Sequence, residues 1–124
     1  MPLYNTATAA VALGVPPKWL DNLLSHNEIT GLQNNAQGVS RRLSVETIAF
    51  LMLTRELIDR MGLAAPTALA VARRLIDAPE GDLSLSPWLR MTFQPSALHA
   101  EVLTRLRRAV ETAPTPRRGR PPKR

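Results

Sequence analysis

Five basic side chains lie within the eleven residues of the segment 114–124, which reads PTPRRGRPPKR. The segment also holds four prolines and one glycine, but no acidic residue and no large apolar residue. Such a composition cannot bury enough apolar surface to fold by itself, so we expect it to be disordered. Its charge suits it to a polyanion, because neutralising phosphates releases counterions. The chemistry open to this segment is therefore nucleic-acid binding, or the weaker role of a basic tail that binds any polyanion.

The basic character of the chain is concentrated in this segment. Of the formal net charge of +6, residues 114–124 contribute +5. Residues 1–113 carry eleven basic and ten acidic side chains, so their net charge is +1. A protein that binds nucleic acid over its whole surface is thereby excluded, since that needs a broadly basic body.

No set of residues in the sequence predicts catalysis. The two histidines, His26 and His99, are far apart in sequence and lack metal-type partners. The chain has no cysteine, which excludes a disulfide framework and a thiolate metal site. We therefore expect no enzyme activity, no metal, no cofactor and no small-molecule ligand.

Signals for export or membrane insertion are also missing. No apolar run approaches the roughly 20 residues that span a bilayer, and the N-terminus lacks the pattern of a signal peptide. We expect a cytoplasmic, nucleoid-associated protein with no membrane partner. Fourteen of the sixteen basic residues are arginine, which favours a GC-rich bacterial or phage genome.

The N-terminal pattern predicts two short helices, over residues 6–13 and 17–26. Gly14 follows the first helix, where a left-handed residue ends a helix. Pro17 suits the first position of the second, because proline lacks an N–H that would be unsatisfied there anyway. Two short helices joined by a glycine-containing turn predict a helix-turn-helix.

Polar turn residues then interrupt the helical pattern and predict a β-hairpin, with strands at 30–34 and 39–43. Arg41 and Arg42 lie on its second strand. A long helix over 45–61 follows, capped by Ser44. The centre of this helix is apolar all round, so it needs a cover on more than one side. That cover can come from the chain's own C-terminal half or from a second copy.

The C-terminal half predicts a helix over 65–77, strands within 82–94 and a helix over 96–112 capped by Ser96. In the strands, apolar and polar residues alternate, and Pro87 fits either a turn between them or an edge strand. The last helix has an apolar stripe formed by Leu98, Val102, Leu106, Ala109 and Val110. This stripe and the doubly apolar helix 45–61 predict a homodimer.

Residues 4 to about 75 resemble the MerR-like, excisionase-like winged helix-turn-helix domain. The matching features are Tyr4, the turn ALGVPP, the order of the elements and the Arg-Arg-x-Ser sequence that leads into the third helix. The resemblance implies that the second helix enters the major groove of DNA and that the hairpin is a wing. The residues that it places on the DNA are Pro17, Lys18, Asn22 and His26 in the helix, and Arg41 and Arg42 in the wing.

One residue departs from the family pattern. Members often have arginine at the position of Asp21, whose carboxylate is unfavourable beside phosphates. An adaptor is therefore the alternative: the winged body would dock another protein, such as a polymerase or a phage packaging component. The basic tail would then serve only as a DNA tether.

The basic segment resembles an AT-hook, whose centre is Arg-Gly-Arg-Pro. The residues that carry this resemblance, and its implied contacts, are Arg117, Arg118, Gly119, Arg120, Pro121, Lys123 and Arg124. A·T-rich minor grooves are narrow and strongly negative, so they attract inserted arginines. Gly119 lacks a Cβ, which lets the backbone lie on the groove floor.

Together these observations predict a mainly α fold with small β-hairpins. We expect a winged helix-turn-helix domain at 1–77, a β-hairpin and helix at 78–113 that build the dimer, and a disordered basic tail at 114–124. The expected function is that of a transcriptional regulator or nucleoid-associated protein that binds A·T-rich double-stranded DNA.

Overall fold

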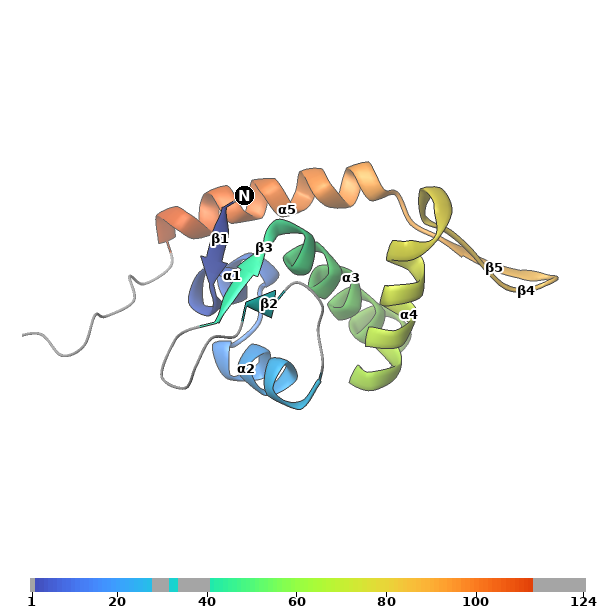
Figure 1. The fold of residues 1–124 in the computed structure, drawn as a ribbon, viewed down its shortest axis with the longest axis horizontal. Coiled ribbons are helices and arrows are strands. Elements are labelled where there is room, and N and C mark those ends of the chain that lie inside the picture. The colour runs from blue at the N-terminus through green and yellow to red at the C-terminus, as the bar shows by residue number, and fades with distance from the viewer. Residues whose placement is uncertain (1, 28–31, 34–40, 113–124) are drawn as a thin grey trace, which may run out of the picture.

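A computed structural model describes residues 2–27, 32–33 and 41–112 (Figure 1). The fold is mainly α with two small antiparallel sheets, as the sequence predicts. The helices are α1 (Thr6–Leu13), α2 (Pro17–His26), α3 (Val45–Met61), α4 (Ala65–Asp77) and α5 (Pro95–Thr112). The strands are β1 (Leu3–Asn5), β2 (Leu32–Gln33), β3 (Arg42–Ser44), β4 (Asp82–Ser86) and β5 (Leu89–Thr92).

The turn between α1 and α2 forms as its residues predict. The Asn5 side chain caps α1 by accepting a hydrogen bond from the Thr8 N–H at 2.8 Å. Gly14 has a φ of 72°, and its N–H reaches the last carbonyls of α1. Only glycine adopts this left-handed conformation without strain, so it ends α1. Pro17 then begins α2.

Three short strands form one sheet in the order β1-β3-β2. β1, which no sequence pattern predicts, lies antiparallel to β3 with Tyr4 opposite Leu43. β2 pairs on the other side, with Leu32 opposite Leu43. β3 ends at Ser44, one residue beyond the end predicted for the second strand of the hairpin. Residues 34–40 lie outside the described ranges. Leu43 is fully buried at the centre of the sheet.

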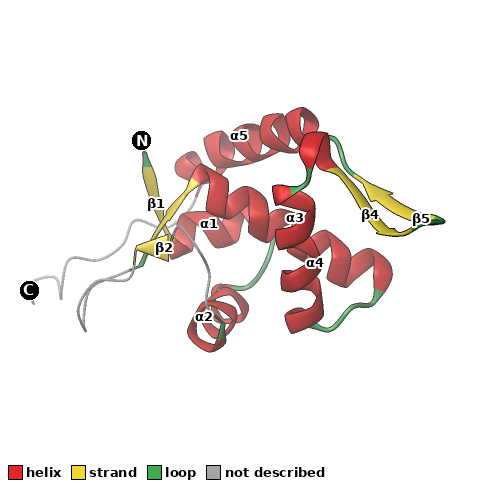
Figure 2. Ribbon diagram, turned by 45° about the vertical axis from the view of Figure 1, so that its right-hand side comes forward, coloured by secondary structure: helices red, strands yellow, loops and turns green. Residues whose placement is uncertain are grey.

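Helix α3 is the centre of the core. Ser44 caps it by accepting from the Thr47 N–H at 3.1 Å. Buried side chains occur all round its central turns, among them Ile48, Phe50 and Leu51. α1, α4 and α5 all contact it, and both views show α5 lying across the body (Figures 1 and 2). The second cover that α3 requires therefore comes from the chain's own C-terminal half.

Helix α5 packs against the body of the same chain. Its Val102, Leu106 and Ala109 are buried, and it contacts α1 and α3. Of the stripe on which the homodimer prediction rests, these three residues are thus covered within one chain, whereas Leu98 is partly buried and Val110 is 61% exposed. The predicted cap at Ser96 is wrong: α5 begins at Pro95, so Ser96 lies inside the first turn. The reason is that proline, with its fixed φ, is well suited to a first helical position.

The β4–β5 hairpin projects from the body next to α4 (Figure 2). Its base is fixed by Gly81, whose carbonyl accepts a hydrogen bond from the Phe93 N–H at 3.0 Å. Gly81 has a φ of 72°, and a Cβ placed on it would lie 2.5 Å from the Phe93 carbonyl oxygen. Neither the conformation nor the space admits a side chain here.

We expect Gly81→Ala to lower the free energy of unfolding by about 2–4 kcal/mol, because it adds backbone strain and a steric clash. Glu80 is the matched control, since it already has a positive φ of 54° without being glycine. Glu80→Gly should leave stability unchanged or raise it by up to about 1 kcal/mol. Urea unfolding followed by circular dichroism measures both, and equal midpoints for Gly81→Ala and the parent would contradict the prediction.

Candidate nucleic-acid interface

Helix α2 presents a polar row on the side opposite the core. Leu20, Leu23 and Leu24 are buried. Lys18, Asn22 and His26 are exposed and follow one another at intervals of four residues. On a helix this spacing places side chains in one row. The structure thus brings three of the four predicted contact residues of α2 onto one exposed face, and the fourth, Pro17, is exposed at the start of the helix.

The orientation of His26 is set by the helix itself. Its Nδ1 lies 2.8 Å from the Asn22 main-chain oxygen. Because a carbonyl oxygen can only accept, Nδ1 carries the proton and donates. In a neutral ring Nε2 is then an acceptor, and in a charged ring it is a second donor. The imidazole can therefore meet either a donor group on a base or a phosphate.

A cation–π contact holds α2 against α3. The Arg55 guanidinium lies over the Trp19 ring, 4.8 Å from its centroid. Trp19 is half-buried and belongs to the rim of the core. This contact, together with the buried leucines, fixes the direction in which the exposed row of α2 faces.

Arg41 turns toward α2 instead of away from the protein. Its Nη2 donates to Ser25 Oγ at 3.0 Å, and its Nη1 lies 3.9 Å from the Asp21 carboxylate. Only 23% of its side chain is exposed. The carboxylate that departs from the family pattern thus has an arginine beside it. Arg41 is thereby joined to α2; it directly precedes β3 and does not lie on that strand, contrary to the prediction.

Arg42 has the opposite orientation. It alternates with the buried Leu43 on β3, so it lies on the other face of the sheet and is exposed. Asn5 and Gln33 are its partners in the strand register. Of the two predicted wing arginines, the structure leaves Arg42 the freer to meet a phosphate.

Carboxylates neutralise most of the helical arginines. Four ion pairs join residues four apart on one helix: Arg55–Asp59, Arg60–Glu56, Arg73–Asp77 and Arg105–Glu101. Within the described residues, some cations have no carboxylate at ion-pair distance. These are Lys18, Arg42, Arg74, Arg107 and Arg108.

Sequence reasoning did not assign Arg107 and Arg108 to the site. Both are exposed near the end of α5. That end lies beside β1, away from the projecting hairpin, in both ribbon views (Figures 1 and 2). The sequence does indicate them by position, since Arg108 lies only six residues before Pro114, the first residue of the basic segment. The AT-hook residues Arg117, Arg118, Gly119, Arg120, Pro121, Lys123 and Arg124 lie outside the described residues.

In the described ranges no three side chains of the metal-binding types gather in one place. None of the helices in those ranges combines the length and hydropathy needed to cross a bilayer. No protein-family model matches the chain, and no curated protein matches it.

We expect Arg41→Ala and Arg42→Ala to differ in stability. Removing Arg41 loses its hydrogen bond to Ser25 and its packing against α2, so the free energy of unfolding should fall by about 1 kcal/mol. Removing the exposed Arg42 should change it by less than about 0.5 kcal/mol. Urea unfolding of the two variants checks this, and equal losses would contradict the orientation of Arg41.

Proposed function

We propose that the protein binds double-stranded DNA, as a transcriptional regulator or nucleoid-associated protein. Residues 114–124 would enter an A·T-rich minor groove, and the exposed row of α2 would face the adjacent major groove. The observation that carries the proposal is the sequence Arg117–Arg124, in which an Arg-Gly-Arg-Pro centre has basic flanks on both sides. A narrow minor groove selects this combination of inserted arginines and a residue without a Cβ.

The unpaired cations of the body support this proposal. Lys18 is on α2, Arg42 is on β3, and Arg107 and Arg108 are near the end of α5. The last two lie between the body and the basic segment. They would extend its positive charge onto the folded domain, where contacts with phosphates fix position without reading sequence.

The length of chain beyond α5 is compatible with two neighbouring grooves. Five residues separate Thr112 from Arg118, so the chain makes six Cα–Cα steps, which reach at most about 20 Å when extended. Successive major and minor grooves on one face of the duplex are half a helical turn apart, which is about 17 Å. With the end of α5 beside the duplex, this reach would place Arg118 in the neighbouring minor groove. The two contacts would reinforce each other through effective concentration.

The second candidate function is an adaptor whose body binds protein and whose tail tethers it to DNA. The observation that favours it is the Asp21–Arg41 pair, because it leaves a carboxylate with 54% of its side chain exposed on α2. A mobility shift at low salt with a chain truncated after Thr115 separates the two. The adaptor body binds no DNA, whereas the proposed regulator retains weak binding.

We expect Gly119→Leu to weaken binding to A·T-rich duplex almost as much as replacing both Arg118 and Arg120 by alanine. The added side chain collides with the groove wall, although the charge is unchanged. Thr115→Leu is the matched control, since it adds the same side chain outside the Arg-Gly-Arg-Pro centre. Fluorescence anisotropy with A·T-rich and G·C-rich duplexes measures the effect. Unchanged affinity of Gly119→Leu for both duplexes would leave only a generic basic tail.

Truncation after Thr115 removes five positive charges. We expect the slope of log K against log salt to become shallower by up to about 4 to 5, because each neutralised phosphate contributes about 0.9. Titrations at several salt concentrations measure this. A minor-groove drug specific for A·T tracts should also compete with the intact chain and much less with the truncated one. An unchanged slope would show that these residues do not meet phosphates.

A further inference from the structure

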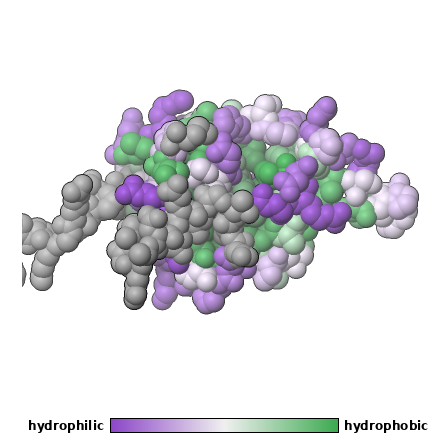
Figure 3. Space-filling model, in the orientation of Figure 1, coloured by the Kyte–Doolittle hydropathy of each residue, from purple (hydrophilic) through white to green (hydrophobic). Residues whose placement is uncertain are grey.

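The tip of the β4–β5 hairpin carries the most exposed large apolar side chain among the described residues. Trp88 is 82% exposed, and its neighbour Leu89 is 45% exposed. The segment Ser86–Leu89, called the hairpin tip below, contains no charged residue. In the space-filling view the projecting end is pale, without the strong purple of charged residues (Figure 3). Tryptophan is enriched at protein interfaces, where its large ring supplies binding energy.

Side-chain contacts at the base of the hairpin hold the tip away from the body. Leu83 and Met91 pair on the apolar face, and Leu83 is buried against the core. On the polar face the Arg90 guanidinium makes two hydrogen bonds to the Asp82 carboxylate, that from Nε being 3.2 Å long. This carboxylate raises the pKa of Arg90 above its ordinary value. The two charges cancel, so no net charge on these strands would steer the tip toward a charged partner.

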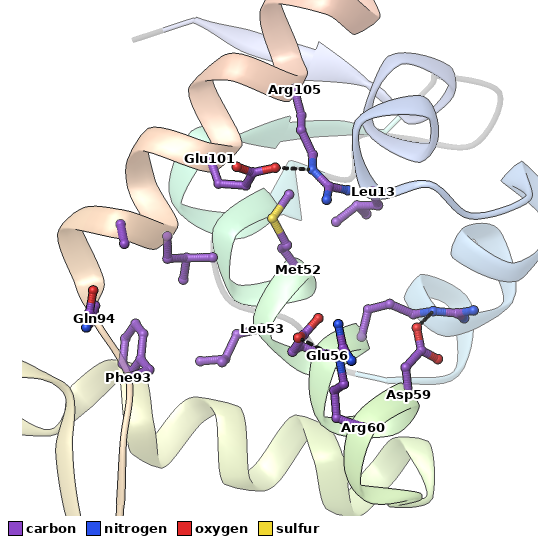
Figure 4. Close-up of a pocket in the computed structure, with 13 residues that line it drawn as sticks. Leu13, Met52, Leu53, Glu56, Asp59, Arg60, Phe93, Gln94, Glu101 and Arg105 are labelled. Atoms are coloured by element: carbon purple, nitrogen blue, oxygen red, sulfur yellow. Dashed lines mark hydrogen bonds and ion pairs between the residues drawn. The ribbon is translucent and has the colours of Figure 1, made fainter.

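A groove of about 630 Å³ lies between α3 and α5, with its wall extending to the end of α1. Apolar side chains project into it: Leu13, Met52, Leu53, Phe93 and Leu98. The charged groups around it are joined in the ion pairs Arg55–Asp59, Arg60–Glu56 and Arg105–Glu101 (Figure 4). Because these charges cancel, the groove favours an occupant that is apolar and uncharged.

The hairpin tip has the chemistry that this groove requires. It cannot enter the groove of its own chain, because Phe93 at the hairpin base lines one end of the groove while the strands lead away from the body (Figures 1 and 4). We propose that the hairpin tip of one copy docks in the α3/α5 groove of a second copy, with Trp88 as the anchor. A twofold arrangement makes the exchange reciprocal and closes the assembly as a dimer.

This interface differs from the one that the sequence predicts. Val102, Leu106 and Ala109 of the α5 stripe are buried within one chain, whereas the hairpin tip and the groove, which Leu98 of that stripe lines, are open. The inference does not depend on DNA binding, and a DNA-free protein tests it.

Sedimentation velocity of the full chain over a range of concentrations is the test. We expect the parent chain to form a dimer and Trp88→Ala to raise the dissociation constant by roughly 30-fold or more, as for an aromatic hot spot. On the groove side, Ala97→Arg should weaken association similarly, because Ala97 is exposed and lines the groove. Ala100→Arg is the matched control: it is exposed on the same helix but does not line the groove, and it should associate like the parent.

Mixing the two defective variants identifies the contact. Trp88→Ala retains a groove and Ala97→Arg retains a tip, so the mixture should recover one of the two contacts and form a weak heterodimer. Iodide quenching of Trp88, obtained by subtracting the signal of Trp88→Phe, should fall as the concentration of the parent rises. A parent that stays monomeric at millimolar concentration overturns the proposal. Unimpaired association of Ala97→Arg does so as well, because the tip would then bind another surface.

Discussion

The need to cover α3 determines where every other part of the molecule lies. Its central turns are apolar around the whole circumference, and α1 can cover only one side. α4 and α5 supply the remaining cover, so the C-terminal half is part of the core and not an appendage. Because α5 must lie across α3 and α1, its last turn is delivered beside β1 and its first turn beside the hairpin base. The positions of the end of α5 and of the projecting hairpin both follow from this packing.

Ion pairs on the helices limit how much positive charge the body can offer to DNA phosphates. Exposed pairs such as Glu101–Arg105 contribute only a few tenths of a kcal/mol each to stability, but they remove charge from the surface. A body of net charge +1 then has few cations left to meet phosphates, of which Arg42, Arg107 and Arg108 are examples. Such a body cannot bind DNA tightly by itself. This is the situation in which a separate basic segment adds most to affinity.

The sequence predicts local features well and long-range pairings poorly. Gly14, Pro17 and Ser44 mark helix boundaries because their conformations or side chains act within a few residues. β1 was missed because three residues carry no periodicity, and its partner β3 lies far along the chain. The approach of Arg41 to Asp21 was missed for the same reason, and with it the different orientation of its neighbour Arg42. The α3/α5 groove likewise arises from the packing of distant segments, so no local sequence pattern predicts it.

The hairpin tip and the end of α5 lie at opposite ends of the body: the hairpin leaves the body beside α4, whereas α5 ends beside β1 (Figure 1). Lys18, Arg42 and Arg107 do not line the groove. Self-association through the tip and groove would therefore not use the cations that are proposed to meet DNA. A dimer would then carry two basic segments, and binding of the first would raise the effective concentration of the second. An assembly of nearly neutral bodies could in this way bind A·T-rich DNA tightly while each single contact stayed weak and readily exchanged.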